Sequence, residues 1–192
     1  ILINQWRNDS EIQHLVSAPF RYVPLAIEKE WVKQKMLNNT YEIYLAICLN
    51  DETHRMIGYT SINEINFINR TAHGGGIIIG DKEFRDGEIK HEVSVLLRKH
   101  IFEDLNLNRL TGACLEEHTA SIVMMLAAGY KLEGVKRQAI YKDGTYHNQL
   151  FFSLLKEDYE ELLKNGQYIL AQYAKRILTF RKQIRTNGKF KI

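Results

Sequence analysis

Residues 74–90 read GGGIIIGDKEFRDGEIK, and the character of the chain changes twice within this stretch. The apolar, β-branched residues near its start predict a strand, the charged residues that follow predict a turn, and apolar residues at helical spacing from Ile89 onward predict a helix. A strand that enters a helix through a turn places unpaired backbone N–H groups and the positive end of the helix dipole at one point. We therefore expect this turn to suit a phosphate or diphosphate group.

The sequence on either side of this stretch alternates between helical and extended patterns. Upstream we expect a helix that starts at Asn8–Glu11, a helix at Ala26–Leu37, and strands at Tyr41–Leu49, Met56–Ile65 and Arg70–Gly80. Downstream we expect a helix over Ile89–Ile101, a strand at Arg109–Leu115, a helix at Thr119–Ala128, and strands at Val135–Lys142 and Tyr146–Leu155 that flank the hairpin signal Asp143-Gly144. This order predicts an α+β fold with a mixed, mainly antiparallel sheet flanked by helices.

The composition is that of a globular protein with one sizeable core. The chain has 192 residues, of which 45% are hydrophobic and only two are proline. Cys48 and Cys114 lie in strand-like segments without paired Cys or His spacing, so we expect neither a disulfide scaffold nor a metal site, and a reducing cytoplasm is the expected location. The sequence has no long apolar run and no signal-peptide pattern at its start, so we expect no membrane partner.

The C-terminal part of the chain differs from the rest in charge. Residues 167–192 contain seven Lys or Arg and no Asp or Glu, although the net charge of the whole chain is only +3. Apolar residues recur there at helical spacing, which predicts a basic amphipathic helix that docks on its own domain, on a second subunit of a homodimer, or on an anionic partner. We place a boundary between residues 1–165 and a helical extension over 166–192, and expect no nucleic-acid partner because no supporting motif accompanies the charge.

Several short segments, in this order, resemble one known family. They are Gln5–Asp9, Arg21–Pro24, Glu30–Val32, Ile57–Tyr59, Leu107–Leu110, Ser121–Tyr130, Glu133–Arg137 and Gly144–Asn148. Together they resemble the GNAT superfamily of acetyl-CoA-dependent N-acetyltransferases over roughly residues 2–160. The similar branch includes ribosomal-protein alanine, spermidine and amino-sugar acetyltransferases. The resemblance also leads us to expect that the family's first strand would precede Ile1.

The resemblance implies that acetyl-CoA is the co-substrate and that its diphosphate is held by backbone amides of one turn. In the family this turn is written as Arg or Gln, two residues, Gly, one residue, then Gly or Ala. In this chain the turn starts at Arg85, and the two glycine positions are occupied by Glu88 and Lys90. Glu88 adds a negative charge near a polyanion, whereas Lys90 could meet a phosphate oxygen directly. The expected cofactor-binding residues are Ile77, Ile78, Ile79, Arg85, Asp86, Gly87, Glu88, Ile89, Lys90, His118 and Ser121.

The expected catalytic residues also follow from the resemblance, with departures from the family pattern. Where relatives carry Asn, Ser and Tyr at the helix after the fifth strand, this chain has His118, Ser121 and Met125, which excludes a tyrosine acid. His118 could bind the pantetheine arm, act as an acid, or only cap its helix. The usual family glutamate aligns with Gly74, so the candidate general bases are Glu64 and His73, which could also be ordinary strand-end polar residues.

The resemblance implies an N-acetyltransferase acting on a primary amine. The start of the chain at Gln5–Asp9 resembles enzymes of small amines, so we expect a polyamine or an amino sugar as acceptor. Acidic residues on the acceptor side would suit a cation; they are Asp9, Glu11, Glu28 and Glu30. Two alternatives stay open: acetylation of protein N-termini, as in the ribosomal-protein branch, and a degenerate, non-catalytic GNAT module that binds through its basic tail.

Overall fold

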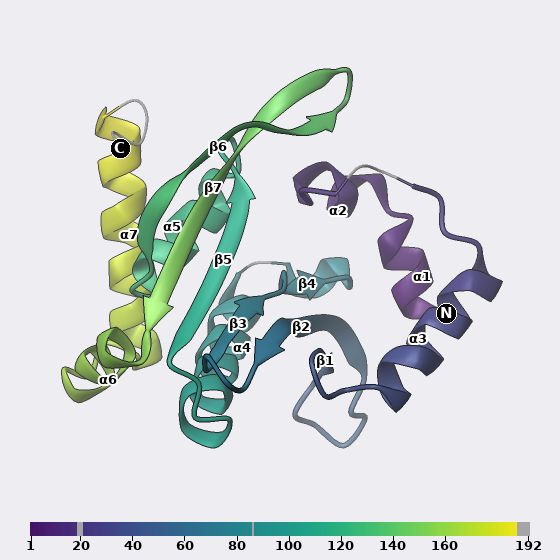
Figure 1. The fold of residues 1–192 in the computed structure, drawn as a ribbon, viewed down its shortest axis with the longest axis horizontal. Coiled ribbons are helices and arrows are strands. Elements are labelled where there is room, and N and C mark those ends of the chain that lie inside the picture. Colours follow the sequence, from purple (N-terminus) through teal and green to yellow (C-terminus); the bar gives the residue numbers. More distant parts are fainter. Residues whose placement is uncertain (19–20, 86, 188–192) are drawn as a thin grey trace.

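The computed structural model describes residues 1–18, 21–85 and 87–187. The helices are α1 (Leu2–Arg7), α2 (Ser10–Leu15), α3 (Leu25–Leu37), α4 (Glu88–Lys99), α5 (Thr119–Ala127), α6 (Lys156–Lys164) and α7 (Leu170–Asn187), with a 3₁₀ turn η1 (Lys82–Phe84) and a π-helical turn η2 (His100–Asp104). The strands are β1 (Ile43–Cys48), β2 (Met56–Asn66), β3 (Thr71–Gly74), β4 (Ile78–Ile79), β5 (Arg109–Leu115), β6 (Lys131–Lys142) and β7 (Thr145–Leu155). This arrangement confirms the α+β fold with a mainly antiparallel sheet flanked by helices (Figure 1).

The sheet has the order β1-β2-β3-β5-β7-β6, and β4 extends it only against β2. Each described pair is antiparallel except β3 and β5, which run parallel from Thr71↔Arg109 to His73↔Thr111. Beyond His73 the two strands part, because β4 pairs with β2 at Gly58↔Ile79 and has no ladder with β5 in the described chain.

The single strand expected over Arg70–Gly80 is therefore wrong, since the structure breaks it into β3 and β4. The break falls on residues 75–77, where glycines follow Gly74. Glycine has no side chain to pack on a sheet and favours irregular backbone. Gly75 also lies too close to β2 for a side chain, since a Cβ there would be 2.0 Å from Ser61 Oγ.

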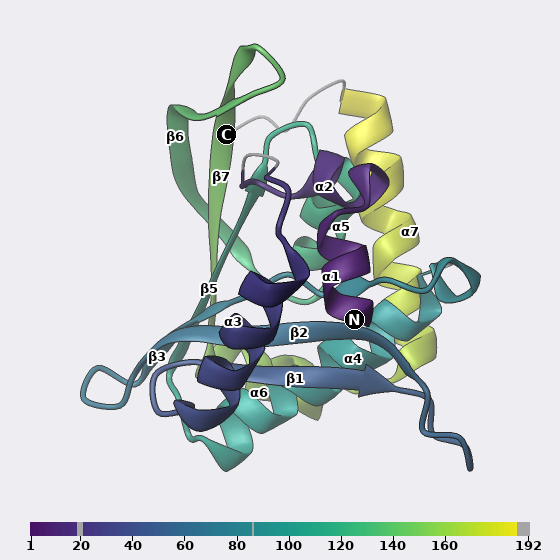
Figure 2. The ribbon, with the colours of Figure 1, turned by 90° about the vertical axis from the view of Figure 1, so that its right-hand side faces the viewer.

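Helices cover the two faces of the sheet unequally (Figures 1 and 2). Helices α1, α2 and α3 lie on one side, where Trp6 stacks on Tyr59 at 6.4 Å and Trp31 meets Tyr44 edge-on at 4.9 Å. Helices α4 to α7 lie on the other side. The main core there is built from apolar residues of β2, β3, β5, β7 and the neighbouring helices; its fully buried members include Ile62, Phe102, Leu107 and Leu154.

Helix α7 docks on its own domain, which is the first of the three expected possibilities. The Tyr173 side chain is fully buried, and its hydroxyl donates to the Met124 carbonyl of α5 at 3.1 Å. Arg176 Nε donates to the Ala127 carbonyl at 2.7 Å, so its charge lies at the negative end of the α5 dipole. In the described part of the chain, no helix is both long enough and apolar enough to cross a membrane.

Candidate active site

Because β3 and β5 separate beyond His73, one edge of β4 has no strand partner among the described residues. The Gly80 N–H donates to the Ile57 carbonyl of β2 at 2.9 Å. Because successive residues of an extended strand direct their N–H groups to opposite edges, the Ile79 N–H points away from β2, to the side of β5. Among Ile77, Ile78 and Ile79, the expected strand amides, the structure thus favours Ile79 as a donor toward a ligand between the parted strands.

The turn after β4 ends in a helix N-terminus that suits an anion. Gly87 is the N-cap of α4, with φ 108° and ψ −17°, and no side chain of the described residues caps this helix. Only glycine adopts such a conformation freely, and a Cβ at Gly87 would meet no atom within 4 Å. The glycine of this turn therefore lies one residue before the family position that Glu88 occupies, and it leaves open space beside the first amides of α4. Asp86, another expected cofactor residue, lies outside the described residues.

Two expected residues, Lys90 and His118, come together at the starts of α4 and α5. Burial and the nearby charge of Arg85 lower the pKa of Lys90, and burial and the charge of Lys90 lower the pKa of His118. His118 is the N-cap of α5, and its Nδ1 accepts the Ser121 N–H at 3.4 Å, which leaves the imidazole proton on Nε2. The Ser121 side chain forms a hydrogen bond with the Cys114 thiol. Burial raises the pKa of this thiol to about 11. Two helix N-termini, a lysine and a histidine thus line one end of the parted strands.

The side chain of Arg85 connects the turn to the N-terminal helices. Its Nε donates to the Ile79 carbonyl at 3.1 Å and its Nη2 to the Gly80 carbonyl at 2.8 Å. The same guanidinium forms ion pairs of 3.2 Å with Asp9 and with Glu11. The Arg85 side chain therefore ties the start of α2 to the turn.

The orientation of the His73 ring is set by a hydrogen bond to Thr111. Its Nδ1 lies 3.0 Å from Thr111 Oγ1, and the Thr111 hydroxyl donates to the Ala72 carbonyl at 3.1 Å. A hydroxyl has a single proton, so when Thr111 donates it to the Ala72 carbonyl, Thr111 accepts from His73, and Nδ1 of His73 carries the hydrogen. In the neutral ring, Nε2 is then the free acceptor, which is the form that a general base needs.

Asn63 adds an unsatisfied acceptor next to this histidine. Asn63 and His73 are directly paired in the register of β2 and β3. The Asn63 Oδ1 atom is buried and has no hydrogen-bond partner among the described residues. Buried polar atoms are seldom left unpaired, so a missing donor such as an amine N–H would fit here. Neither Asn63 nor Thr111 was expected from the sequence, which gives no signal for which strand residues share a face until the register is known.

Glu64, the other candidate base, is placed less favourably. It lies at the irregularity of the β2–β3 pairing, with φ 52°, and its side chain is exposed. It forms no hydrogen bond or ion pair with another described residue. Of the two candidates, the structure favours His73.

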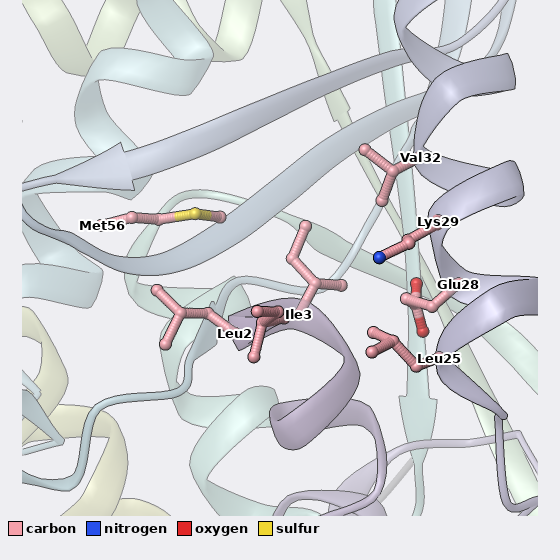
Figure 3. Close-up of a pocket in the computed structure, with 8 residues that line it drawn as sticks. Leu2, Ile3, Leu25, Glu28, Lys29, Val32 and Met56 are labelled. Atoms are coloured by element: carbon pink, nitrogen blue, oxygen red, sulfur yellow. The ribbon is translucent and has the colours of Figure 1, made fainter.

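A separate cavity of about 390 Å³ lies between α1, α3 and the start of β2 (Figure 3). It is lined by Ile1, Leu2, Ile3, Leu25, Glu28, Lys29, Val32 and Met56. None of these residues belongs to β3, β4, β5 or α4. This largely apolar cavity is therefore distinct from the site at the parted strands.

Comparison with known proteins identifies the family of this chain. Residues 1–131 match the model of a family described as the acetyltransferase (GNAT) domain. The chain therefore belongs to the GNAT acetyltransferase family, which confirms the resemblance seen in the sequence.

Two curated relatives come from Bacillus subtilis (strain 168). The chain is 30% identical over 105 residues to the "Putative ribosomal N-acetyltransferase YdaF" and 28% identical over 105 residues to the "Uncharacterized N-acetyltransferase YoaA". These matches cover 55% of this chain, and 56% and 58% of the two relatives. The chain thus spans a little over half the length of the curated relatives it matches.

Solved structures share the fold at lower identity. A spermidine N-acetyltransferase from Vibrio cholerae, in complex with CoA and spermine, superposes with a TM-score of 0.73 at 20% identity, covering 82% of this chain and 90% of that one. A GCN5-related N-acetyltransferase from Brucella melitensis gives a TM-score of 0.69 at 16% identity, covering 88% and 76%. At these identities the likeness concerns the fold alone.

Proposed function

We propose that this chain transfers the acetyl group of acetyl-CoA to the primary amine of a small molecule, of the polyamine or amino-sugar class. The observation that carries the proposal is the arrangement at the parted strands. His73 and the Asn63 Oδ1 atom, which has no hydrogen-bond partner among the described residues, lie on one side of the gap between the separated strands. The N-termini of α4 and α5 lie on the other side of this gap. Membership of the GNAT family supports the same reaction.

The residues present fit the cofactor. Backbone amides at the start of α4, beside the open space at Gly87, would hold a diphosphate together with Lys90. Acetyl-CoA, when bound, supplies a thioester carbonyl as the group to be attacked. The Ile79 N–H, on the unpaired edge of β4, is positioned to donate to a carbonyl oxygen and to stabilise negative charge on it.

Side chains of this protein would orient the acceptor amine and transfer its proton. The acceptor amine would donate one N–H to Asn63 Oδ1 and be oriented by it, while His73 Nε2 removes the proton that the nitrogen loses as it attacks. His118 would carry its hydrogen on Nε2, because Nδ1 accepts the Ser121 N–H, and it could donate this hydrogen to the bound cofactor. Glu88 contributes no step in this scheme.

The electrostatic argument for a polycation is weaker than the sequence suggested. Asp9 pairs with Arg85, and Glu11 pairs with Arg85 and with Lys82, whose Nζ lies 2.9 Å away. Glu28 pairs with Arg7 at 3.1 Å. These carboxylates are therefore partly neutralised, so the preference for a small amine rests on the resemblance of Gln5–Asp9.

The test combines cofactor binding with an acceptor panel. Calorimetry with CoA should give micromolar affinity, and thiol release from acetyl-CoA should depend on a small amine such as spermidine or glucosamine rather than on a peptide with a free N-terminus. His73→Gln should lower kcat by about 10²-fold or more, whereas the matched change Glu64→Gln should leave it within about twofold.

Three results would contradict the proposal in different ways. Turnover with the peptide alone would favour acetylation of protein N-termini, in line with the ribosomal name of the Bacillus relative. Absence of CoA binding at millimolar concentration would favour a non-catalytic module. An unchanged kcat in His73→Gln would remove His73 as the base.

A further inference from the structure

Helix α7 runs antiparallel to α4, toward the end of α4 that would hold the diphosphate. The Tyr168 ring, just before α7, lies against the Arg98 guanidinium at 4.9 Å, and the Tyr173 ring meets the His91 ring at 5.3 Å. Residue numbers therefore increase along α7 in the direction in which they decrease along α4. Farther along α7, Phe180 and Ile184 pack on the cluster that contains Ile122, from the first half of α5. The later turns of α7 thus approach the starts of both α4 and α5 (Figures 1 and 2).

The last turns of α7 extend beyond the start of α4. The Tyr173 ring contacts both the His91 ring, at 5.3 Å, and the Arg98 guanidinium, at 5.4 Å, so Tyr173 lies level with the stretch between these two residues. From that stretch to Glu88 the helix axis advances about 5 to 10 Å at about 1.5 Å per residue. Over the same axis, Arg181 lies about 12 Å and Arg185 about 18 Å past Tyr173. The two arginines therefore project roughly 2 to 13 Å beyond the first residue of α4. This is the range that the nucleotide end of a cofactor would occupy if its diphosphate lay on the amides of α4.

This projecting segment is basic. Helix α7 has no acidic residue, and Arg181, Lys182 and Arg185 are exposed. The guanidinium groups of Arg181 and Arg185 form no ion pair or hydrogen bond within the part of the chain that the structure describes. Since they are four residues apart, they lie on the same side of the helix, where one anionic group can meet both.

We propose that Arg181 and Arg185 bind the 3′-phosphate on the adenosine end of acetyl-CoA. The inference rests on the proposed function and extends it from the diphosphate to the nucleotide end of the same ligand. A terminal phosphate carries nearly two negative charges and three strong acceptor oxygens, and arginine pairs with such a group through two parallel N–H bonds. Helix α7, which begins beyond the residues that match the family model, would then be part of the cofactor site of this chain.

The chain offers a matched control on the same helix. Lys175 is also exposed and basic, but it lies about 9 Å before Arg181 along the helix axis, alongside the body of α4. Lys175→Gln removes a positive charge from α7 without reaching the projecting end. A general effect of net charge should therefore appear in this variant, whereas a local phosphate contact should not.

The experiment measures binding of CoA and of dephospho-CoA, which differ only by the 3′-phosphate, to the full chain by calorimetry. The wild type and Lys175→Gln should bind CoA about 10-fold or more tightly than dephospho-CoA. The double variant Arg181→Gln with Arg185→Gln should lose this ratio through weaker CoA binding, with dephospho-CoA affinity unchanged. Adenosine 3′,5′-bisphosphate should compete with CoA for the wild type and compete much less well for the double variant. Unchanged circular dichroism and melting midpoint would establish that the double variant is folded.

The outcomes separate the two levels of the argument. If the double variant keeps the wild-type ratio, or if the wild type binds both cofactors equally, the phosphate contact is excluded and the basic end of α7 faces another partner. If the wild type binds neither cofactor, the proposed function fails, and this inference fails with it.

Discussion

The tautomer of His73 depends on two groups, the Thr111 hydroxyl and the backbone carbonyl of Ala72. Thr111 comes from β5, and the Ala72 carbonyl takes the only proton that the Thr111 hydroxyl has. The parallel pairing of β3 and β5 brings Thr111 opposite His73. The histidine could be predicted from the sequence as a candidate base, but the residue that fixes its tautomer could not, because strand register is a long-range property.

Replacing Thr111 should therefore affect catalysis without affecting cofactor binding. Thr111→Val keeps the shape of the side chain but removes the hydroxyl, which leaves His73 Nδ1 without its acceptor and frees the other tautomer. We expect kcat to fall by about 10-fold, less than the 10² to 10⁴ attributed to a whole general base. Thr111→Ser keeps the hydroxyl and should restore most of the rate. Steady-state kinetics would check both variants, with calorimetry to establish that CoA affinity is unchanged. Equal losses of kcat in the serine and valine variants would indicate a packing role for Thr111.

At the scale of elements, sequence patterns located most helices and strands but missed what tertiary contacts impose. The hairpin around Asp143-Gly144 forms as predicted, with φ 49° and 79° at the two turn residues. Helix α2 begins as predicted, because Asp9 accepts the Glu11 N–H at 2.9 Å. Helix α1 was not predicted, since no side chain caps its start and its first turn has no acidic residue. It is held by the burial of Trp6 over Tyr59, a contact that no local pattern encodes.

The N-cap of α5 should make the stability of the protein depend on pH. Only the neutral imidazole of His118 can accept the Ser121 N–H, and burial and Lys90 lower the pKa of His118 below its usual 6.5. As the pH falls through this usual value, the unfolded chain takes up a proton at His118 before the folded chain does. The free energy of unfolding should therefore decrease with falling pH because of this residue.

His118→Asn isolates this contribution, because asparagine is a strong N-cap that does not titrate. At about pH 8 the variant and the wild type should differ by no more than about 0.5 kcal/mol in free energy of unfolding. Between about pH 7 and pH 5 the wild type should lose stability relative to the variant. Denaturant melts across this range give the comparison, and parallel curves would show that the cap does not titrate. The other histidines are present in both proteins and cancel.

For the whole molecule, the question is whether α7 is an appendage or part of the core. The sequence places a boundary at Asn165–Gly166, where the charge changes sign, and that boundary stays a prediction. In the structure, Tyr168 belongs to the main core of the sheet, and Tyr173 and Ile177 form a buried cluster with α5. Phe180 and Ile184 pack on that cluster and on the one beneath β5 and β7. Apolar contacts are thus continuous from the sheet to α7, which favours unfolding in one step.

Adjacent residues of α7 allow this to be tested. Ile177 is 4% exposed and Leu178 is 64% exposed, so truncation of each to alanine removes apolar atoms from the core or from the surface of the same helix. Ile177→Ala should lower the free energy of unfolding by about 2–5 kcal/mol. Leu178→Ala should change it by no more than about 0.5 kcal/mol. If α7 is part of the core, Ile177→Ala should shift the whole transition, with far-ultraviolet circular dichroism and the fluorescence of Trp6 and Trp31 moving together. These tryptophans lie on the opposite side of the sheet, so an early loss of helical signal with unchanged fluorescence would mean that α7 unfolds alone.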